Sequence, residues 1–304
     1  MTTDYEPAEQ DAPHNQPIME PPSFENEDID KTRLPISSNN KSSSRQKKQK
    51  TAVQKLFDIS QLKIVGFYQS LFSEFLGTMI LTIVCTATGL PITSKPVIDL
   101  NGALASGLIV STIVIGFGHV SGAHINPAVT LSFLVTGEID FIRAIAYVIM
   151  QLIGATCGSA LVKAITPSNT QAKLGMTLIT EGVSPTQAFT VEFIITFILC
   201  YTVHAICDKN RNDIGGSKAL AVGFAVTIGC LFGGPYTGAA MNPARSFGPA
   251  FVANFWKNHW IYWYGPLAGA TMAALVYTRV LKKKASASTS SEHPSSAPIN
   301  SSEY

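Results

Sequence analysis

One short motif occurs twice in this chain, and the distance between its copies limits the folds that the chain can adopt. Residues 121–128 read SGAHINPA and residues 237–244 read TGAAMNPA. A carboxylate lies upstream of each copy inside an apolar run, Glu74 before the first and Glu192 before the second. Three apolar runs separate the copies, so the second half of the chain enters a membrane from the opposite side. The sequence therefore predicts an inverted repeat.

The lengths of the apolar runs indicate a membrane protein. Of the 304 residues, 46% are hydrophobic and only 14% are charged, which disfavours a soluble globular fold. A run of about 20 apolar residues crosses the hydrocarbon core of a bilayer. Six such runs predict six transmembrane helices, at residues 67–90, 102–120, 141–165, 188–206, 219–232 and 260–281.

Basic residues gather at both ends of this apolar region, in residues 45–50 and 282–284. Positive residues beside a span mark its cytoplasmic flank, and an even number of crossings returns both termini to one side. We therefore predict a multi-pass protein of the cell membrane with both termini in the cytoplasm. The polar compositions of the ends predict disordered tails at 1–65 and 285–304. Between them lies a membrane domain at 66–284, with repeats at about 66–165 and 186–284.

Each copy of the motif ends in Asn-Pro-Ala and is followed by an apolar run too short to cross a bilayer, at residues 129–135 and 247–253. Pro127 and Pro243 suit the first turn of a helix, where a missing N–H costs nothing. These runs predict half-helices that enter the membrane and stop midway. Irregular backbone at membrane depth persists only where protein or water satisfies it, so two opposed half-helices predict a water-lined passage.

With these features the chain resembles the aquaporin family, the major intrinsic proteins. The resemblance rests on the two Asn-Pro-Ala boxes, the Ser-Gly-Ala-His before the first, and the Arg-Ser-Phe-Gly-Pro after the second. It extends over residues 67–282. It implies an all-α membrane protein with six transmembrane helices and two re-entrant half-helices in an inverted repeat. It also implies a homotetramer with one pore per subunit and passive passage of water without protons.

The resemblance assigns roles to particular residues. The pore motifs are Asn126, Pro127, Ala128, Asn242, Pro243 and Ala244, and the residues that support their loops are Glu74, Glu192 and His124. The two asparagines, at the positive ends of the half-helices, would donate hydrogen bonds to a passing water and interrupt the chain along which protons hop. We expect each glutamate to accept hydrogen bonds from the backbone of its loop, and a proton relay is the alternative.

The narrow selectivity ring of the family corresponds to Ser106, Cys230, Ala239 and Arg245. Arg245 would supply donors to the permeant and a positive charge against cations. Water-selective members carry a bulky aromatic residue at the position of Ser106 and a histidine at that of Cys230. Because both large side chains are missing here, the sequence predicts a wider ring that passes glycerol and urea beside water. A strictly water-selective pore is the alternative.

Residues outside the ring match the water-channel subgroup of the family: Ser246, Ala250, Tyr262 and Trp263. A small residue in place of the ring histidine within this lineage is typical of the insect entomoglyceroporins. We therefore expect the chain to resemble that subgroup most.

Other classes of function fit the sequence less well. Inverted repeats with broken helices also build ion-coupled carriers, but the chain offers paired asparagine donors and no cluster of coupling carboxylates. An enzyme would need a nucleophile with a base, or a metal cluster, and neither pattern occurs. We expect no catalytic residue, metal or cofactor. The partners are water, small uncharged solutes and membrane lipid, and no nucleic acid.

The cysteines lie in apolar runs and lack a metal-like spacing: Cys85, Cys157, Cys200, Cys207 and Cys230. We expect Cys230 to line the ring and the other four to be buried as packing residues.

Overall fold

The computed structural model of the chain describes residues 57, 59–90, 99–171, 173–211 and 213–282, all of which fall in one compact unit, Gln49–Tyr304. The predicted tail at 285–304 and residues 1–56 of the predicted N-terminal tail lie outside the described residues. Within the rest of that N-terminal tail, Ile59–Lys63 form a 3₁₀ helix, η1. Its Gln61 donates a hydrogen bond to Asp140 at 2.6 Å, which orders this part of the predicted tail.

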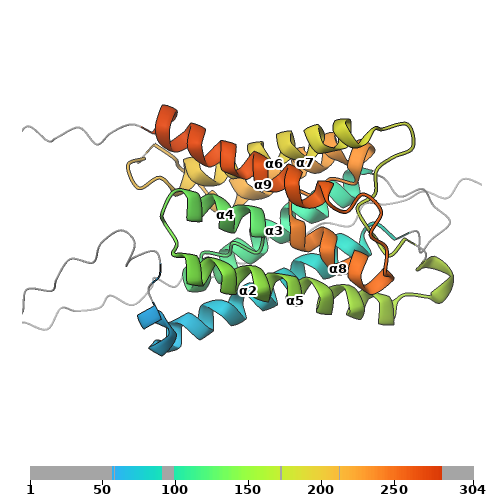
Figure 1. Cartoon of the computed structure of the whole chain (residues 1–304), viewed down its shortest axis with the longest axis horizontal. Helices are drawn as coiled ribbons and strands as arrows, with labels where there is room; N and C mark the ends of the chain where they lie inside the picture. The colour runs from blue at the N-terminus through green and yellow to red at the C-terminus, as the bar shows by residue number, and fades with distance from the viewer. Residues whose placement is uncertain (1–56, 58, 91–98, 172, 212, 283–304) are drawn as a thin grey trace, which may run out of the picture. The chain divides into compact units, whose positions relative to one another are not determined.

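The regular elements of the described part are all helical (Figure 1). In chain order they are η1, α2 (Val65–Ala87), α3 (Asp99–Ser121), α4 (Pro127–Val135), α5 (Phe141–Ile165), η2 (Ser168–Thr170), α6 (Pro185–Cys207), α7 (Lys218–Thr237), α8 (Pro243–Ala253), α9 (Ile261–Val276) and a π-helical turn, η3 (Tyr277–Leu281). Helices α4 and α8 are the short ones that follow the Asn-Pro-Ala boxes, with 9 and 11 residues.

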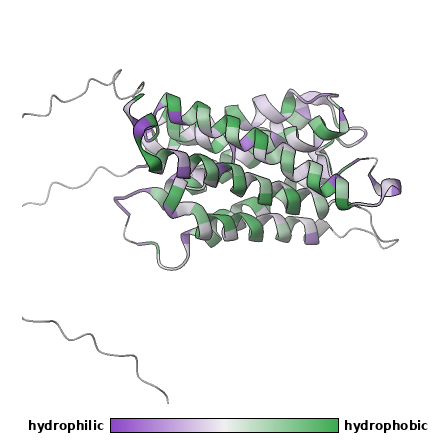
Figure 2. Ribbon diagram, turned by 90° about the horizontal axis from the view of Figure 1, so that it is seen from below, coloured by the Kyte–Doolittle hydropathy of each residue, from purple (hydrophilic) through white to green (hydrophobic). Residues whose placement is uncertain are grey.

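The long helices have the dimensions of membrane spans. Within the described residues, α2, α3, α5, α6 and α7 are long and apolar enough to cross a bilayer. Helix α9 has only 16 residues, but the five-residue turn η3 continues it. Large hydrophobic side chains cover the outward faces, among them Tyr68, Phe72, Ile115 and Phe224, each more than half exposed. Figure 2 shows hydrophobic residues along the whole length of the helices, which suits contact with lipid.

The two halves of the bundle interlock. In each half the first and third long helices pack together, α2 with α5 and α6 with α9, and α3 meets α7 between the halves. Each short helix packs against the last long helix of the other half, α8 on α5 and α4 on α9. This exchange brings the starts of α4 and α8 together near the centre of the bundle.

Glycines at matching positions of the two repeats allow this close packing. A Cβ atom at Gly154 of α5 would collide with the carbonyl oxygen of Phe75 on α2, and one at Gly269 of α9 with that of Phe193 on α6. Between α3 and α7, Gly107 and Gly223 face each other's backbone. Small residues let membrane helices approach until their backbones touch.

We expect Gly154→Ala to destabilise the protein by about 1–3 kcal/mol, because the added methyl group meets backbone rather than a side chain that can rotate away. The matched control is Gly116→Ala in α3, where a Cβ would have no neighbour within 4 Å. Thermal unfolding in detergent measures both variants. Equal melting temperatures for the two would contradict the packing described here.

Several helix ends differ from the sequence-based expectations. Helix α6 starts at Pro185, three residues earlier than predicted, because Ser184 and Gln187 form a capping box. Helix α7 continues past the predicted end at residue 232 to Thr237 and includes Pro235 in its last turn. The hydroxyl and N–H of Thr180 donate to the carbonyls of Pro235 and Tyr236, at 2.7 and 3.0 Å, which satisfies backbone groups of that last turn.

Candidate functional site

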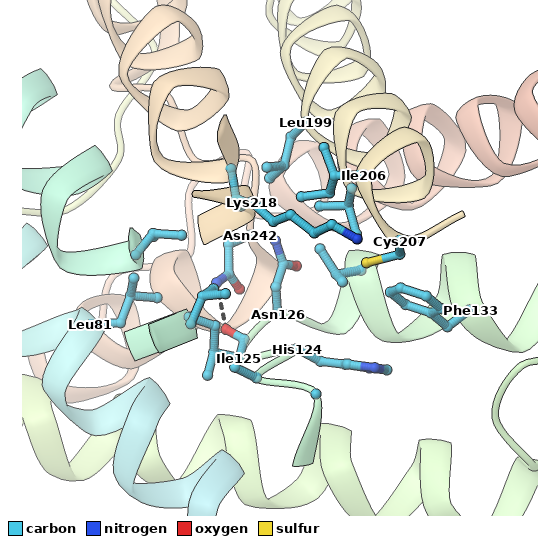
Figure 3. A pocket seen from close by; sticks show the side chains of 17 residues that line it. Leu81, His124, Ile125, Asn126, Phe133, Leu199, Ile206, Cys207, Lys218 and Asn242 are labelled. Carbon is cyan, nitrogen blue, oxygen red and sulfur yellow. Dashed lines mark hydrogen bonds between the residues drawn. The ribbon is translucent and has the colours of Figure 1, made fainter. Parts of the chain in front are cut away.

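The two Asn-Pro-Ala boxes meet through their asparagines. Asn126 caps α4 by accepting the N–H of Ala128 at 2.8 Å, and Asn242 caps α8 by accepting that of Ala244 at 3.0 Å. Each carboxamide also reaches the other loop: Asn126 Nδ2 donates to the Met241 carbonyl at 2.9 Å. Asn242 Nδ2 donates to the Ile125 carbonyl at 2.8 Å, the bond dashed in Figure 3. Since an amide carries two N–H groups, each asparagine keeps one further donor.

The loops before the boxes have an unusual backbone. Ala123 and Ile125 in the first loop have φ of 48° and 46°, and Ala239 and Met241 in the second have 47° and 51°. Such left-handed conformations cost about 1–3 kcal/mol at residues with a side chain and persist only where the surroundings enforce them. The same pattern in both loops shows that the inverted repeat extends to the backbone.

Glu74 holds the backbone of the first loop in this conformation. It is fully buried, and its Oε1 accepts the Ser121 hydroxyl at 2.6 Å and the His124 N–H at 2.9 Å. Its Oε2 accepts the Ile125 N–H at 2.6 Å and the Gln151 amide at 2.8 Å. These bonds satisfy a loop that has no helical partners.

Glu192 does the same in the second loop. Also fully buried, it accepts the Thr237 hydroxyl at 2.6 Å and the Ala240 N–H at 2.9 Å through Oε1, and the Met241 N–H at 2.9 Å through Oε2. With both oxygens occupied by donors from one loop, the geometry is that of a structural support.

His124 packs in the first loop between two aromatic rings. It stacks on Phe133 at 4.7 Å between ring centroids and meets the edge of Tyr147 at 5.3 Å. Its Nδ1 lies 3.2 Å from the Thr130 hydroxyl, which also accepts a hydrogen bond from Gln151. The sequence analysis missed Gln151 and Thr130, because a lone amide or hydroxyl in an apolar run carries no signal of its own.

Tyrosines at equivalent positions fix the ends of the helices before the boxes. Tyr147 donates to the carbonyl of Ser121 and Tyr262 to that of Thr237, both at 2.9 Å. Tyr262, expected only as a subgroup marker, thus has a structural contact of its own.

The predicted ring residues line a narrow cavity of about 40 Å³, which we call the constriction. Its lining includes Ser106, Cys230, Ala239, Arg245, Cys85 and both box asparagines. Arg245 donates to the carbonyls of Gly175 and Cys85, each at 3.0 Å. The Cys85 thiol lies 3.5 Å from the Ser106 hydroxyl. The sequence analysis did not predict Cys85 here, because none of the four ring positions of the family falls in its helix, α2.

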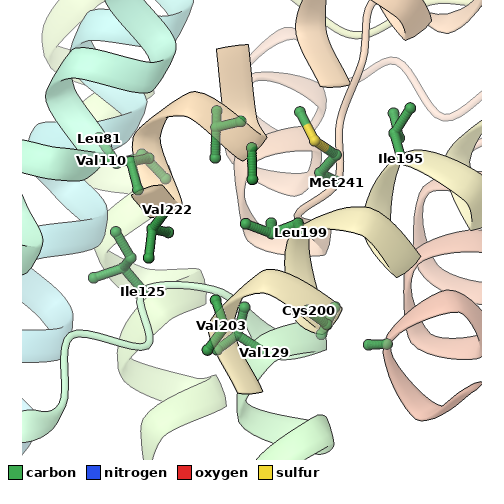
Figure 4. Close-up of a cluster of buried hydrophobic side chains, with 14 of the residues drawn as sticks. Leu81, Val110, Ile125, Val129, Ile195, Leu199, Cys200, Val203, Val222 and Met241 are labelled. Carbon is green, nitrogen blue, oxygen red and sulfur yellow. The ribbon is translucent and has the colours of Figure 1, made fainter. Parts of the chain in front are cut away.

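A second cavity, of about 140 Å³, lies on the other side of the two asparagines, and we call it the vestibule. Figure 3 shows its lining, in which Asn126 and Asn242 face apolar side chains such as Leu199 and Ile206. Both cavities are bordered by Leu81, Val110, Asn126, Leu199 and Asn242. The buried apolar cluster around this region is drawn in Figure 4. The asparagine pair therefore stands where the two cavities meet.

A profile of the major intrinsic protein family matches residues 61–277. The chain belongs to this family, the aquaporins. It is 44% identical over 223 residues to the lens fiber major intrinsic protein of Oryctolagus cuniculus, covering 73% of this chain and 84% of the relative. It is 42% identical over 219 residues to aquaporin-4 of Mus musculus, covering 71% of this chain and 68% of the relative. The aquaglyceroporin of Plasmodium falciparum has a similar structure, with a TM-score of 0.64 and 26% identity over 70% of this chain and 96% of that one.

Membership identifies the molecule as a multi-pass, all-helical membrane channel rather than an enzyme. The sequence-based prediction of the aquaporin fold is thereby confirmed. The family implies permeation of water.

The cysteines of this aquaporin do not all lie where the sequence analysis expected them. Cys200 is buried, but Cys157 and Cys207 are exposed, and Cys207 borders the vestibule. Cys85 is buried inside the bundle, where it lines the constriction. The expectation of four packing cysteines was wrong for Cys157 and Cys207. Lipid and protein interior are both apolar, so the apolar span around Cys157 does not reveal which face is buried, and Cys207 is the last residue of α6, beside the vestibule.

Proposed function

We propose that this aquaporin passes water, glycerol and urea through the constriction. The observation that carries the proposal is the size of the lining side chains: among the described residues around the constriction none is aromatic and none is histidine. Ser106, Cys230 and Ala239 leave room opposite Arg245 for a solute larger than water. Similarity to a protein named an aquaglyceroporin supports passage of glycerol, and similarity to aquaporin-4 supports passage of water.

The box asparagines and Arg245 provide selectivity in this proposal. The free N–H of Asn126 and that of Asn242 donate to a permeant at the junction of the two cavities, where the half-helix dipoles are positive. Arg245, held by two carbonyls, keeps a fixed charge beside the permeant. Together they stabilise neutral hydrogen-bonding solutes and repel cations.

We further propose the predicted orientation and assembly. The channel domain spans residues 66–284, with both termini in the cytoplasm of a cell membrane, and the subunits form a homotetramer with one pore each. The insect entomoglyceroporins are the subgroup that it resembles, on the strength of Cys230 in a water-channel background of Ser246, Ala250, Tyr262 and Trp263.

A coupled carrier is the alternative from another class, and flux in vesicles containing the purified protein separates the two. Through a channel, solute flux rises in proportion to the gradient and does not change when a sodium or proton gradient is imposed. A carrier would saturate and respond to the ion gradient. The bonds of Glu74 and Glu192 favour the channel, because both carboxylates are occupied by loop donors.

Two cysteines in the constriction predict sensitivity to mercury. A membrane-impermeant organomercurial applied to whole cells from outside should block flux by reacting with Cys230 or Cys85, whereas Cys207 lies at the opposite end of the passage. Cys230→Ser alone should keep part of the block, and the double variant with Cys85→Ser should lose it. Cys157 is exposed on α5 and lines neither cavity, so Cys157→Ser is the control and should behave as wild type. Persistent block in the double variant would place the constriction elsewhere.

A further inference from the structure

A lysine stands at the end of the vestibule farthest from Arg245. Lys218 is the first residue of α7, is exposed, and lines the vestibule. In Figure 3 its side chain extends toward Ile206 and Cys207 on α6, which line the same cavity. The Lys218 side chain therefore borders the vestibule rather than pointing away from it.

Two acidic residues near this end, Asp208 and Asp213, are bound to other groups, whereas Glu138 is exposed and lines the neighbouring cavity. Asp208 accepts the Asn210 N–H and the Tyr277 hydroxyl, both at 3.0 Å, and lies 3.8 Å from the Lys282 ammonium. The hydrogen bond from the Asn210 N–H lowers the pKa of Asp208 most, and the contacts with Tyr277 and Lys282 lower it further. Asp213 is paired with Arg211 at 2.7 Å. Within the described residues, no carboxylate oxygen lies within 4.0 Å of the Lys218 ammonium.

The surroundings strengthen the effect of this charge. Apart from Lys218, the vestibule is lined mainly by apolar side chains, including Val114, Phe133, Val203 and Val222. Low-dielectric walls focus the field of a charge along the water between them. An ion that enters from the α6–α7 end meets the lysine before it reaches the positive ends of α4 and α8.

We propose that Lys218 is a second charge filter, a specificity-determining residue that excludes cations at the end of the passage opposite Arg245. This inference rests on the proposed function, since it needs a conducting passage through the constriction and the vestibule. Arg245 and Lys218 act as barriers in series, so either alone keeps cation flux low. The contribution of Lys218 becomes measurable when the charge at position 245 is removed.

The test measures sodium conductance in planar bilayers, divided by the water flux of the same variant. Arg245→Val combined with Lys218→Met should conduct about tenfold more than Arg245→Val alone, as expected for the loss of one partly screened charge. Lys218→Arg in the same background should conduct as little as Arg245→Val. The matched control is Lys209→Met in the Arg245→Val background, which should conduct as Arg245→Val does. Lys209 is also exposed near this end, but it lines a neighbouring cavity. Equal conductance with and without Lys218, including none in either, would overturn the proposal.

A second measurement keeps Arg245 and therefore its contacts. Lys218→Glu alone should conduct more sodium than wild type at low salt, and the difference should disappear in concentrated salt, because the Debye length falls from about 30 Å at 0.01 M to about 3 Å at 1 M. No difference at low salt would contradict the inference. Its failure is distinct from failure of the proposed function: in the first case vesicles still pass water, glycerol and urea, and in the second they fail to pass at least one of the three.

Discussion

Glu192→Ala should prevent the second Asn-Pro-Ala loop from forming and abolish flux. The substitution leaves the N–H groups of Ala240 and Met241 without an acceptor in a fully buried site, and leaves the Thr237 hydroxyl only its longer bond to the Gly233 carbonyl, at 3.3 Å. Each orphaned buried donor costs about 1–3 kcal/mol, so the two together cost about 2–6 kcal/mol. That is comparable to the whole stability of many domains. Unfolding in detergent and water flux in vesicles measure the two effects.

Glu74→Ala should behave in the same way, because Glu74 supports the first loop with equivalent bonds. Glu181→Ala is the control, since Glu181 is exposed in the loop before α6. Glu192→Gln separates support from proton relay: it retains an acceptor oxygen and should keep part of the flux. Normal stability and flux in Glu192→Ala would show that the loop is held by other contacts.

Restoring bulk to the constriction should change which solutes pass. The double substitution Ser106→Phe with Cys230→His should reduce glycerol and urea flux by about tenfold or more, which corresponds to a barrier raised by about 1.4 kcal/mol, and leave water flux within about threefold. Glycerol and urea are excluded because the ring closes around a single file of water. Stopped-flow light scattering of vesicles measures all three fluxes.

The control for this double variant is Cys157→His, which adds a histidine at an exposed cysteine of α5. It should leave every flux as in wild type. Unchanged glycerol flux in the double variant would mean that Ser106 and Cys230 do not determine the width of the passage.

Much of this architecture could be predicted from the sequence, because its determinants are local. A duplicated Asn-Pro-Ala box, apolar runs of membrane length and proline at the first helical position are all visible without a structure. Glu74 and Glu192 stood out because a carboxylate in an apolar run needs a partner.

The rest depends on which face of a helix points where. A soluble helix shows its buried side by an apolar stripe, but a membrane helix is apolar all round, so Cys157 and Cys200 look alike in the sequence although one is exposed and the other buried. The carbonyls that hold Arg245 come from Gly175 and Cys85, far away in the chain, and a carbonyl has no sequence signature. The position of Lys218 beside the vestibule depends on the packing of α6 against α7, which the sequence does not reveal.

The most direct test of the proposed function is the flux of water, glycerol and urea through one preparation of vesicles containing the wild-type protein, compared with protein-free vesicles. A constriction lined by Ser106, Cys230 and Ala239 opposite Arg245 predicts that all three permeate above background and that the solute fluxes rise without saturation. Water flux without glycerol or urea flux would contradict the wide constriction.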